Sequence, residues 1–480
     1  MDYSQFLVMK QEIALLVVFL LVFLCDTFMP KRSQGAIGWI SIIAFAVATV
    51  FGFCPDLIYA TGNAFSGMYS SGTAEIAIKN VLNIGALIVM IQALRWAQQD
   101  MVKVRRGEFY ELLLVTLFGM YLMISSRHFL LFVIGLETAS LPLAAMVAFD
   151  KHRYESHEAA VKYVLTAVFS SAIFLLGLSF VYGLTGTLYF DGIAVATMAS
   201  GISTLLVISL AFVIAGIGFK LSLVPFHLWT ADVYQGAPTP VTSYLSVISK
   251  GAAAFAFLIV LWKAFGTVYS QAWEWMLYAL IILTITIGNL FAMRQRNMKR
   301  FLAFSSISQA GYIMLGVIAF NSLGLTALMY YVLVYIFSNL AAFGVIGAIE
   351  NATGKVHMDD YKGLYKTNPR LAFTMMLAMF SLAGIPPFAG FFSKFFIFTG
   401  AINQGSVAIY VLVLIALINT IISLYYYLLV VKAMFISQDD CTIANFRSAC
   451  SERFALWVCV AGIIGVGIVS CVYNYLYQMA

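Results

Sequence analysis

The chain has 480 residues, of which 62% are hydrophobic and only 10% are charged. A soluble domain carries roughly 25% charged residues, so the composition excludes an ordinary soluble fold and indicates a membrane protein. The net charge of +6 is spread over short segments, which argues against nucleic-acid binding, and the six cysteines lack the spacing of a metal site or a disulfide framework.

Apolar windows of roughly 20 residues, long enough to cross a bilayer, recur along the whole chain. We place fourteen of them, near 11–29, 37–57, 77–97, 109–126, 128–149, 159–183, 203–234 (interrupted), 241–265, 273–293, 300–320, 324–348, 371–402 (interrupted), 407–435 and 454–477. The predicted fold is therefore an all-α polytopic membrane protein with about fourteen transmembrane helices.

The basic residues fall mainly on one side of this pattern. The segments after odd-numbered windows carry Lys and Arg at 31–32, 103–106, 151–153, 294–300, 355–370 and 432–453, whereas the opposite side has Lys10, Arg127 and Lys263. Since positively charged loops stay in the cytoplasm, both termini are predicted on the non-cytoplasmic side. Lys79 and Arg95, near helix ends, are expected to extend their side chains to the interface.

Lys220 is the most informative residue, because it lies at the end of an apolar run and five residues before Pro225. An ammonium group at bilayer depth costs about 2.5 to 3.5 kcal/mol on insertion scales and usually marks a polar path. Pro225 removes a helical hydrogen bond, and a broken helix persists at that depth only where protein or water satisfies the freed groups. A buried cation beside a broken helix indicates ion handling.

Two further ionisable residues fall near mid-membrane, Glu137 on the fifth helix and Lys250 on the eighth. Burial disfavours a charged group unless an opposite charge is near, so we expect a lysine close to Glu137. A fixed helix-packing ion pair is one interpretation, but such a pair contributes little stability in a low dielectric. A pair that forms and breaks as protons move is favoured. For Lys250, a relay role is favoured over a structural contact with a carbonyl or a distant acid.

Lys394 follows a second break, at 385–388, that resembles the first one at 224–226. The breaks fall on the seventh and twelfth helices, which must cross in opposite directions, as in transporters built from inverted repeats. The predicted domains are helices 1–3 (residues 1–107), a first inverted repeat of helices 4–8 (108–268), a second of helices 9–13 (269–436), and a cytoplasmic loop with helix 14 (437–480).

Other polar residues are candidate proton-uptake or connecting groups. Glu158 and Lys162 share a helix face, and they form either a helix-stabilising pair or a site of proton uptake or subunit contact. His227 and Asp232 follow the first break, where a cap or loop hydrogen bond explains either residue equally well. For Tyr425–Tyr427, an aromatic packing cluster is favoured over relay hydroxyls.

Several catalytic patterns are missing from the sequence. It has no Walker-type loop, no dinucleotide-binding glycine pattern on a strand, and no haem or iron–sulfur cysteines. We therefore expect no cofactor and no redox centre in this chain. The energy for ion movement must come from an ion gradient or from partner subunits.

The run 218–230, continued by 232–242, resembles the hallmark of the antiporter-like subunits of respiratory complex I, and the likeness extends over nearly the whole chain, including 297–312. The segment 232–238 resembles the N-type subunits in particular. Lys394 supports this, since M-type subunits usually have a glutamate there. Ala231 departs from the proline that the family commonly has, but it touches no proposed proton site.

The resemblance implies a non-redox subunit of a proton-translocating NADH:quinone oxidoreductase in a bacterial inner membrane. Glu137 would pair with Lys220, whose proton passes toward Lys250, and Lys394 would be the exit-side lysine. Flavin, iron–sulfur clusters and quinone would belong to partner subunits. The expected neighbours are an M-type antiporter-like subunit, small K-, J- and A-type subunits and the lipid bilayer.

Three alternatives stay open. The chain could be a subunit of an Mrp-type cation/proton antiporter, or of a ferredoxin-linked or hydrogenase relative, and the copurifying subunits would distinguish these. It could also be a structural membrane subunit whose buried charges only lock helices together. In that case, replacing Lys220 with methionine would leave quinone-coupled proton pumping intact.

Overall fold

The computed structural model describes residues 3–30, 34–54, 61–99, 102–266, 273–436 and 442–480. Lys31 and Arg32, which contribute to the orientation argument, and Cys441 lie outside these ranges, as do the predicted domain boundaries at 268–269 and 437. The domain division therefore stays a prediction.

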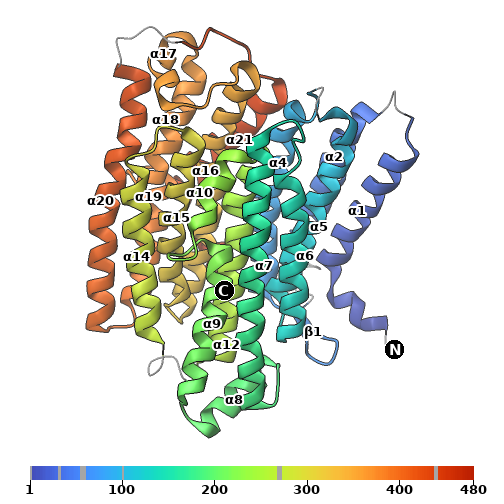
Figure 1. Ribbon diagram of the computed structural model, residues 1–480, viewed down its shortest axis with the longest axis vertical. Coiled ribbons are helices and arrows are strands. Elements are labelled where there is room, and N and C mark those ends of the chain that lie inside the picture. The colour runs from blue at the N-terminus through green and yellow to red at the C-terminus, as the bar shows by residue number, and fades with distance from the viewer. Residues whose placement is uncertain (1–2, 31–33, 55–60, 100–101, 267–272, 437–441) are drawn as a thin grey trace.

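The described chain is a bundle of helices that extends from α1 on one side to α20 on the other (Figure 1). Its first part contains α1 (Lys10–Phe28), α2 (Ile37–Phe51), α4 (Thr73–Trp96), α5 (Arg106–Ser125), α6 (Phe129–Val147), α7 (Tyr154–Thr185), α8 (Phe190–Ser200), α9 (Thr204–Leu221), α10 (Leu228–Gly236), α11 (Thr239–Tyr244) and α12 (Lys250–Ala264). A π-helical turn, Leu245–Ser249, joins α11 to α12.

The second part contains α14 (Glu274–Ala292), α15 (Met298–Val317), α16 (Ser322–Thr353), α17 (Leu364–Thr367), α18 (Pro369–Ala383), α19 (Ala389–Ile402), α20 (Val407–Ile436), α21 (Cys450–Ile468) and α22 (Cys471–Met479). A short antiparallel hairpin, β1 (Gly62–Ala64) and β2 (Tyr69–Ser71), precedes α4. Helix α16 lies at the centre, since nearly all of its side chains are buried against α4, α15, α18, α19 and α21.

Twelve helical segments among the described residues are long and apolar enough to cross a membrane. The two other predicted windows are helical but differ for physical reasons: α15 carries several serines and a glutamine, and the window 371–402 is divided into α18 and α19. The all-α polytopic fold with two discontinuous helices is confirmed, whereas the count of fourteen and the inverted repeats stay predictions.

The two broken helices run in opposite directions. The end of α10 lies beside the start of α15, where the Lys299 Nζ donates to the Ala237 carbonyl at 2.8 Å. The start of α15 in turn pairs with the segment that leads into α18, since Met298 N–H donates to the Val356 carbonyl at 2.9 Å. Helix α10 therefore ends at the side of the bundle where α18 begins, as transporters with antiparallel halves require.

Two details of the sequence prediction are wrong. The window 454–477 is not one helix, because α21 ends at Ile468 and α22 starts at Cys471. Lys79 does not extend to an interface: its side chain is fully buried, and its Nζ lies 2.6 Å from Glu12 Oε1 of α1. A carboxylate at this distance partly offsets the free-energy cost of removing the ammonium from water.

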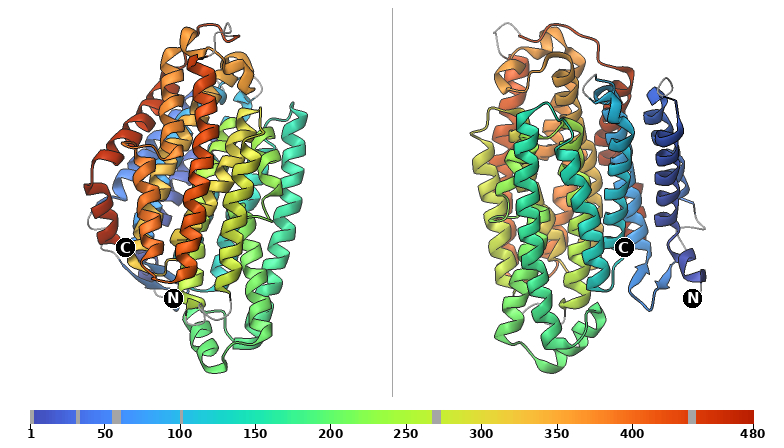
Figure 2. Two further views of the ribbon diagram at one scale, coloured as in Figure 1. Left: turned by 90° about the vertical axis from the view of Figure 1, so that its left-hand side faces the viewer. Right: turned by 45° about the vertical axis from the view of Figure 1, so that its right-hand side comes forward.

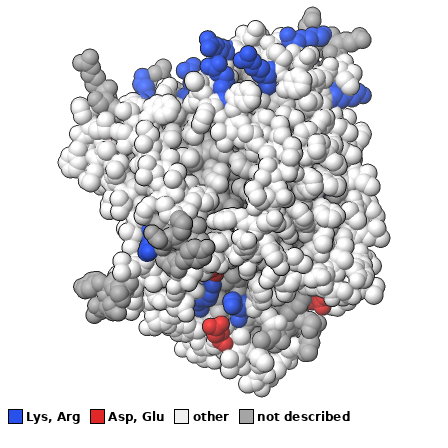
Figure 3. Space-filling model, turned by 180° about the vertical axis from the view of Figure 1, so that it is seen from behind, with Lys and Arg blue, Asp and Glu red and all other residues white. Residues whose placement is uncertain are grey.

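The two ends of the bundle differ in charge. Lysine and arginine side chains gather at the end where α17, α18 and α21 begin, which is uppermost in Figures 1 and 3. The opposite end is capped by α8, which projects beyond the other helices in both views of Figure 2. The sequence analysis did not predict α8, because eleven residues are too short for a membrane span.

Candidate functional site

Lys220 is the penultimate residue of α9, where the helix stops at the first break. Its side chain is buried, and its Nζ donates to Ser140 Oγ on α6 at 2.8 Å and lies 3.5 Å from the Tyr163 hydroxyl on α7. Both partners are neutral oxygen atoms. The ammonium is therefore solvated by hydroxyl groups from two neighbouring helices.

Glu137 lies on α6, three residues before Ser140 and on the same helix face. Its Oε1 accepts a hydrogen bond from Ser171 Oγ on α7 at 2.6 Å. Within the described ranges, no ion pair joins Glu137 directly to Lys220. In place of a direct ion pair, each residue has its own serine partner: Ser140 contacts Lys220, and Ser171 contacts Glu137.

Lys250 is the first residue of α12, immediately after the π-helical turn. It is almost completely buried, and its Nζ donates to Ser306 Oγ at 2.7 Å and to the Ser306 carbonyl at 3.3 Å. The Tyr234 ring lies beneath it, with 5.5 Å between Nζ and the ring centroid. A π-turn shifts the side chains that follow it around the helix axis, and such turns are frequent at functional sites.

Aromatic rings lie between Lys220 and Lys250. The Tyr163 ring next to Lys220 packs edge-on against Trp229 at 5.2 Å, and Trp229 packs against Tyr234 at 6.3 Å. In the described part of the chain, no hydrogen-bonded chain links the two lysines directly. Proton transfer between them requires water or movement of a tyrosine hydroxyl.

Lys394 lies on α19, just after the second break. Its Nζ donates to the Leu382 and Ala383 carbonyls, both at 2.9 Å, which are the last carbonyls of α18. These groups have no helical partner because the helix stops there. Lys394 thus donates hydrogen bonds to the carbonyls that the second break, predicted from the sequence, leaves without helical partners.

Polar side chains of α15 and α20 lie between Lys250 and Lys394. Ser305, next to the Lys250 partner Ser306, hydrogen-bonds to the Tyr427 hydroxyl at 2.5 Å. The Gln309 Nε2 donates to that hydroxyl at 3.1 Å and to the Leu382 carbonyl at 3.3 Å. Since Lys394 donates to the same carbonyl, a buried series of hydrogen bonds runs from Ser305 to Lys394, and the adjacency of Ser305 and Ser306 along the chain relates it to Lys250.

The tyrosine cluster was assigned to packing from the sequence, and the structure divides it. Tyr425 is exposed, whereas Tyr426 and Tyr427 are buried with ring centroids 4.6 Å apart. Tyr427 therefore packs and also contributes its hydroxyl to the polar series.

Glu158 and Lys162 form the predicted pair, with 2.7 Å between Oε1 and Nζ. Lys162 also lies 2.7 Å from Asp232 Oδ2 on α10, and the other oxygen of Asp232 lies 2.5 Å from Arg300 on α15. Asp232 therefore ties α10 to α7 and α15. His227 is buried in the first break, immediately before α10, and is not joined to this group by a hydrogen bond among the described residues.

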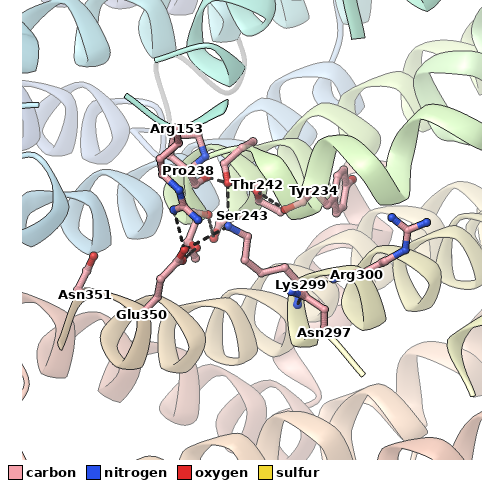
Figure 4. A network of polar contacts seen from close by, with 12 residues as sticks. Arg153, Tyr234, Pro238, Thr242, Ser243, Asn297, Lys299, Arg300, Glu350 and Asn351 are labelled. Carbon is pink, nitrogen blue, oxygen red and sulfur yellow. Dashed lines mark hydrogen bonds and ion pairs between the residues drawn. The ribbon is translucent and has the colours of Figure 1, made fainter. Parts of the chain in front are cut away.

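One polar cluster was missed by sequence analysis. Glu350, near the end of α16, accepts a hydrogen bond from Arg153 at 3.0 Å and another from Thr239, and its Oε1 lies 3.6 Å from Lys299 Nζ (Figure 4). Lys299 was counted among loop charges, yet its side chain is only 1% exposed. The only signal in the sequence was a glutamate at the end of a long apolar run.

Neither a metal site nor a disulfide is found among the described residues: no three of their His, Cys, Asp and Glu side chains could hold a metal ion together, and the five cysteines they include are free.

Comparisons with known proteins decide the family. Residues 126–423 match the family described as NADH:quinone oxidoreductase/Mrp antiporter, TM. The chain belongs to this family. Two relatives align over essentially the full length: NADH-quinone oxidoreductase subunit N of Phocaeicola vulgatus is 52% identical, with all of both chains covered, and that of Azobacteroides pseudotrichonymphae is 50% identical, with 99% and 98% covered.

Solved structures agree with this family assignment. A chain of respiratory complex I from Thermus thermophilus is 31% identical and has a TM-score of 0.79, with 95% of this chain and 97% of that chain covered. A chain of the Mrp complex from Dietzia is 21% identical and has a TM-score of 0.84, with 100% of this chain and 97% of that chain covered. This likeness shows that the two chains share a fold. The resemblance to antiporter-like subunits seen in the sequence is confirmed.

Proposed function

We propose that this chain is a proton-translocating, antiporter-like membrane subunit of an NADH:quinone oxidoreductase, of the N type. The names of the two full-length relatives and the likeness to a complex I chain support this assignment. The Mrp likeness is too distant in sequence to favour an antiporter complex. No specific feature of the described residues favours a hydrogenase relative.

One observation carries the proton-conducting role. Buried lysines near the bundle ends, Lys79 and Lys299, each lie close to a carboxylate. The hydrogen bonds of Lys220, Lys250 and Lys394 go instead to neutral hydroxyl and carbonyl oxygens. An ammonium without a bound carboxylate can release its proton without leaving a buried, unpaired anion behind. The two sets of lysines therefore suit different tasks, structural at the ends and proton transfer in the middle.

The proposed path begins near Glu137 and Lys220, continues through Lys250, and leaves by way of Lys394. Glu158, Lys162 and His227 are proposed as uptake or connecting groups. Asp232 supports this role, since it joins the exposed Glu158–Lys162 pair to the helix that follows the first break.

This chain would carry no redox centre, and flavin, iron–sulfur clusters and quinone would be held by partner subunits. We place the protein in a bacterial inner membrane, with the basic end of the bundle in the cytoplasm and both termini outside. Its proposed neighbours are an M-type antiporter-like subunit and small K-, J- and A-type subunits.

Copurification tests the assignment. The chain is tagged at its C-terminus, extracted from native membranes in mild detergent and purified. Partners are identified by mass spectrometry, and quinone reduction by the purified assembly is measured. Copurification with iron–sulfur and quinone-site subunits is expected. Recovery with Mrp-type or hydrogenase subunits instead would contradict the proposal.

A further inference from the structure

A groove of about 950 Å³ lies at the basic end of the bundle, away from the lysine path. It is formed by the first halves of α18 and α21 and by the segment 445–448 that precedes α21. Ligand sites in proteins typically have volumes of about 300 to 1,000 Å³. The groove is therefore large enough to hold a molecule or a substantial part of one.

Three arginines line this groove: Arg370, Arg447 and Arg453. Within the described residues none of them forms an ion pair, and the Nε of Arg453 is buried without a hydrogen-bond partner. The neighbouring carboxylate, Glu452, does not line the groove, because it accepts hydrogen bonds from Asn351 at 3.1 Å and from the Ala449 N–H at 2.9 Å. The positive charge in the groove is therefore not neutralised by the chain.

The positions of two arginines on their helices also indicate that the groove favours an anion. Arg370 is the second residue of α18 and Arg453 is the fourth of α21. The first turn of a helix is the positive end of its dipole, where an anion is stabilised and a cation is not. The preference for basic residues in cytoplasmic loops explains arginines at this end. It does not explain their convergence on one groove at two helix N-termini.

The rest of the groove is apolar. Its walls include Leu371, Phe373, Leu377, Leu456, Trp457 and Val460. Trp457 is 72% exposed, and tryptophan is enriched where a membrane protein meets the headgroup region. An inorganic anion would contact the arginines but not these walls. A molecule with an anionic head and a hydrocarbon tail would contact both.

The segment that carries Arg447 is fixed in place. Asn368, just before α18, donates from Nδ2 to the Ala444 carbonyl at 3.1 Å and accepts from the Phe446 N–H at 3.3 Å. Arg447 is thereby held next to the N-terminus of α18. The three arginines come from three chain segments whose relative positions are set by hydrogen bonds and helix packing.

We propose that this groove binds an anionic phospholipid, whose phosphate lies among the three arginines and whose acyl chain lies along the apolar wall between α18 and α21. Basic pockets between transmembrane helices on the cytoplasmic side suit such headgroups. The lipid would seal the seam between α18, which leads to the second helix break, and α21. This site is independent of the proton path.

Photo-crosslinking of the intact assembly tests the proposal. The purified assembly that contains this chain is incubated with phosphatidylglycerol or phosphatidylcholine carrying a photoreactive acyl chain, and labelled peptides are identified by mass spectrometry. Phosphatidylglycerol is expected to label α18 and α21 at least about fivefold more than phosphatidylcholine, the factor expected for a single arginine contact to an anionic headgroup.

Variants separate this site from general charge effects. The R370Q/R447Q/R453Q variant is expected to lower phosphatidylglycerol labelling to the phosphatidylcholine level. The control R95Q/K151Q/K432Q removes the same charge from the same predicted side of the membrane and should leave labelling unchanged. Leu377→Trp, which fills the apolar wall and keeps the arginines, should also abolish labelling.

Several results would overturn the proposal. Equal labelling by the two lipids in the wild-type assembly would show that no anionic headgroup is selected, and this result needs no variant. Loss of labelling in excess inorganic phosphate would assign the groove to a free anion. A crosslink from α18 or α21 to another subunit at this groove would show that protein covers it.

Discussion

At the residue scale, the account depends on what each buried lysine contacts. Lys79 lies 2.6 Å from a carboxylate oxygen, whereas the hydrogen bonds of Lys220 and Lys250 go to serine oxygens. A buried ion pair is strongly disrupted when one member changes charge, while a hydroxyl group tolerates both forms of a lysine. The contacts thus distinguish lysines paired with a carboxylate from the lysines that we propose exchange protons.

The Gln309 side chain gives a prediction at this scale. Gln309→Leu removes the hydrogen bonds that its Nε2 donates to the Tyr427 hydroxyl and the Leu382 carbonyl, and the one that its Oε1 accepts from the Tyr331 hydroxyl, and it keeps a similar volume. Proton pumping by the reconstituted assembly is expected to fall by at least about tenfold, less than the roughly 100-fold that a group exchanging the proton itself contributes, because Gln309 only orients its neighbours. Gln295→Leu, in the connection between α14 and α15, serves as the control and should pump normally. Normal pumping by Gln309→Leu would exclude this connection.

The sequence identified the lysines but not their partners. A charge in an apolar run and a proline five residues later are visible in one dimension, so Lys220 and its break were predictable. Ser140, Ser306 and Gln309 are ordinary helix-packing residues on other helices, and only tertiary packing brings them to a lysine. For the same reason the contact between Glu137 and Ser171 could not be foreseen.

At the element scale, the two helix breaks are stabilised differently. After the first break, α10 is held by ion pairs of its own Asp232 with Lys162 of α7 and Arg300 of α15. At the second break, Lys394 itself binds the free carbonyls of α18. The second break therefore depends on a proposed relay residue, and a change in the protonation of Lys394 would act directly on the backbone.

The Glu350 cluster gives a prediction about how helices are joined. Glu350→Gln leaves Lys299 buried without its carboxylate, which typically destabilises a protein by about 3 to 5 kcal/mol. Thermal dissociation of this chain from the purified assembly should therefore occur at a lower temperature. The double variant Lys299→Met with Glu350→Leu replaces the charges by apolar groups and should recover most of the loss. Equal destabilisation by both variants would contradict the ion-pair explanation.

Sequence reasoning predicted long elements well and short ones poorly. The windows matched the long helices closely because twenty apolar residues carry a strong signal. The eleven residues of α8 and the three-residue strands of the hairpin carry almost none. From the sequence, Lys299 was counted among the loop charges. A residue at the start of a helix cannot be told from a loop residue when its burial by α10 and α16 is unknown.

At the scale of the whole molecule, the charge difference between the two ends sets the proposed orientation. On the face drawn in Figure 3, lysine and arginine side chains gather at the end opposite α8. Positively charged loops remain in the cytoplasm, so the end capped by α8 is expected outside. Protons would then move from the basic end toward the α8 end.

Cysteine labelling checks this orientation. Lys151→Cys, between α6 and α7, and Ser200→Cys, at the end of α8, place single thiols at opposite ends of the bundle in a background without other exposed cysteines. A membrane-impermeant maleimide added to whole spheroplasts should label Ser200→Cys only, and inside-out vesicles should give the reverse. Labelling of Lys151→Cys in spheroplasts would invert the proposed direction of transport.

The central claim is that buried lysines without a carboxylate contact carry protons. It is tested most directly by the rate of quinone-coupled proton pumping in proteoliposomes that contain the whole assembly with Lys220→Met, compared with Lys151→Met as a matched surface control. The account predicts assembly in normal amount and a loss of pumping of at least about tenfold for Lys220→Met alone. Wild-type pumping by a fully assembled Lys220→Met variant would contradict it and leave Lys220 a structural residue.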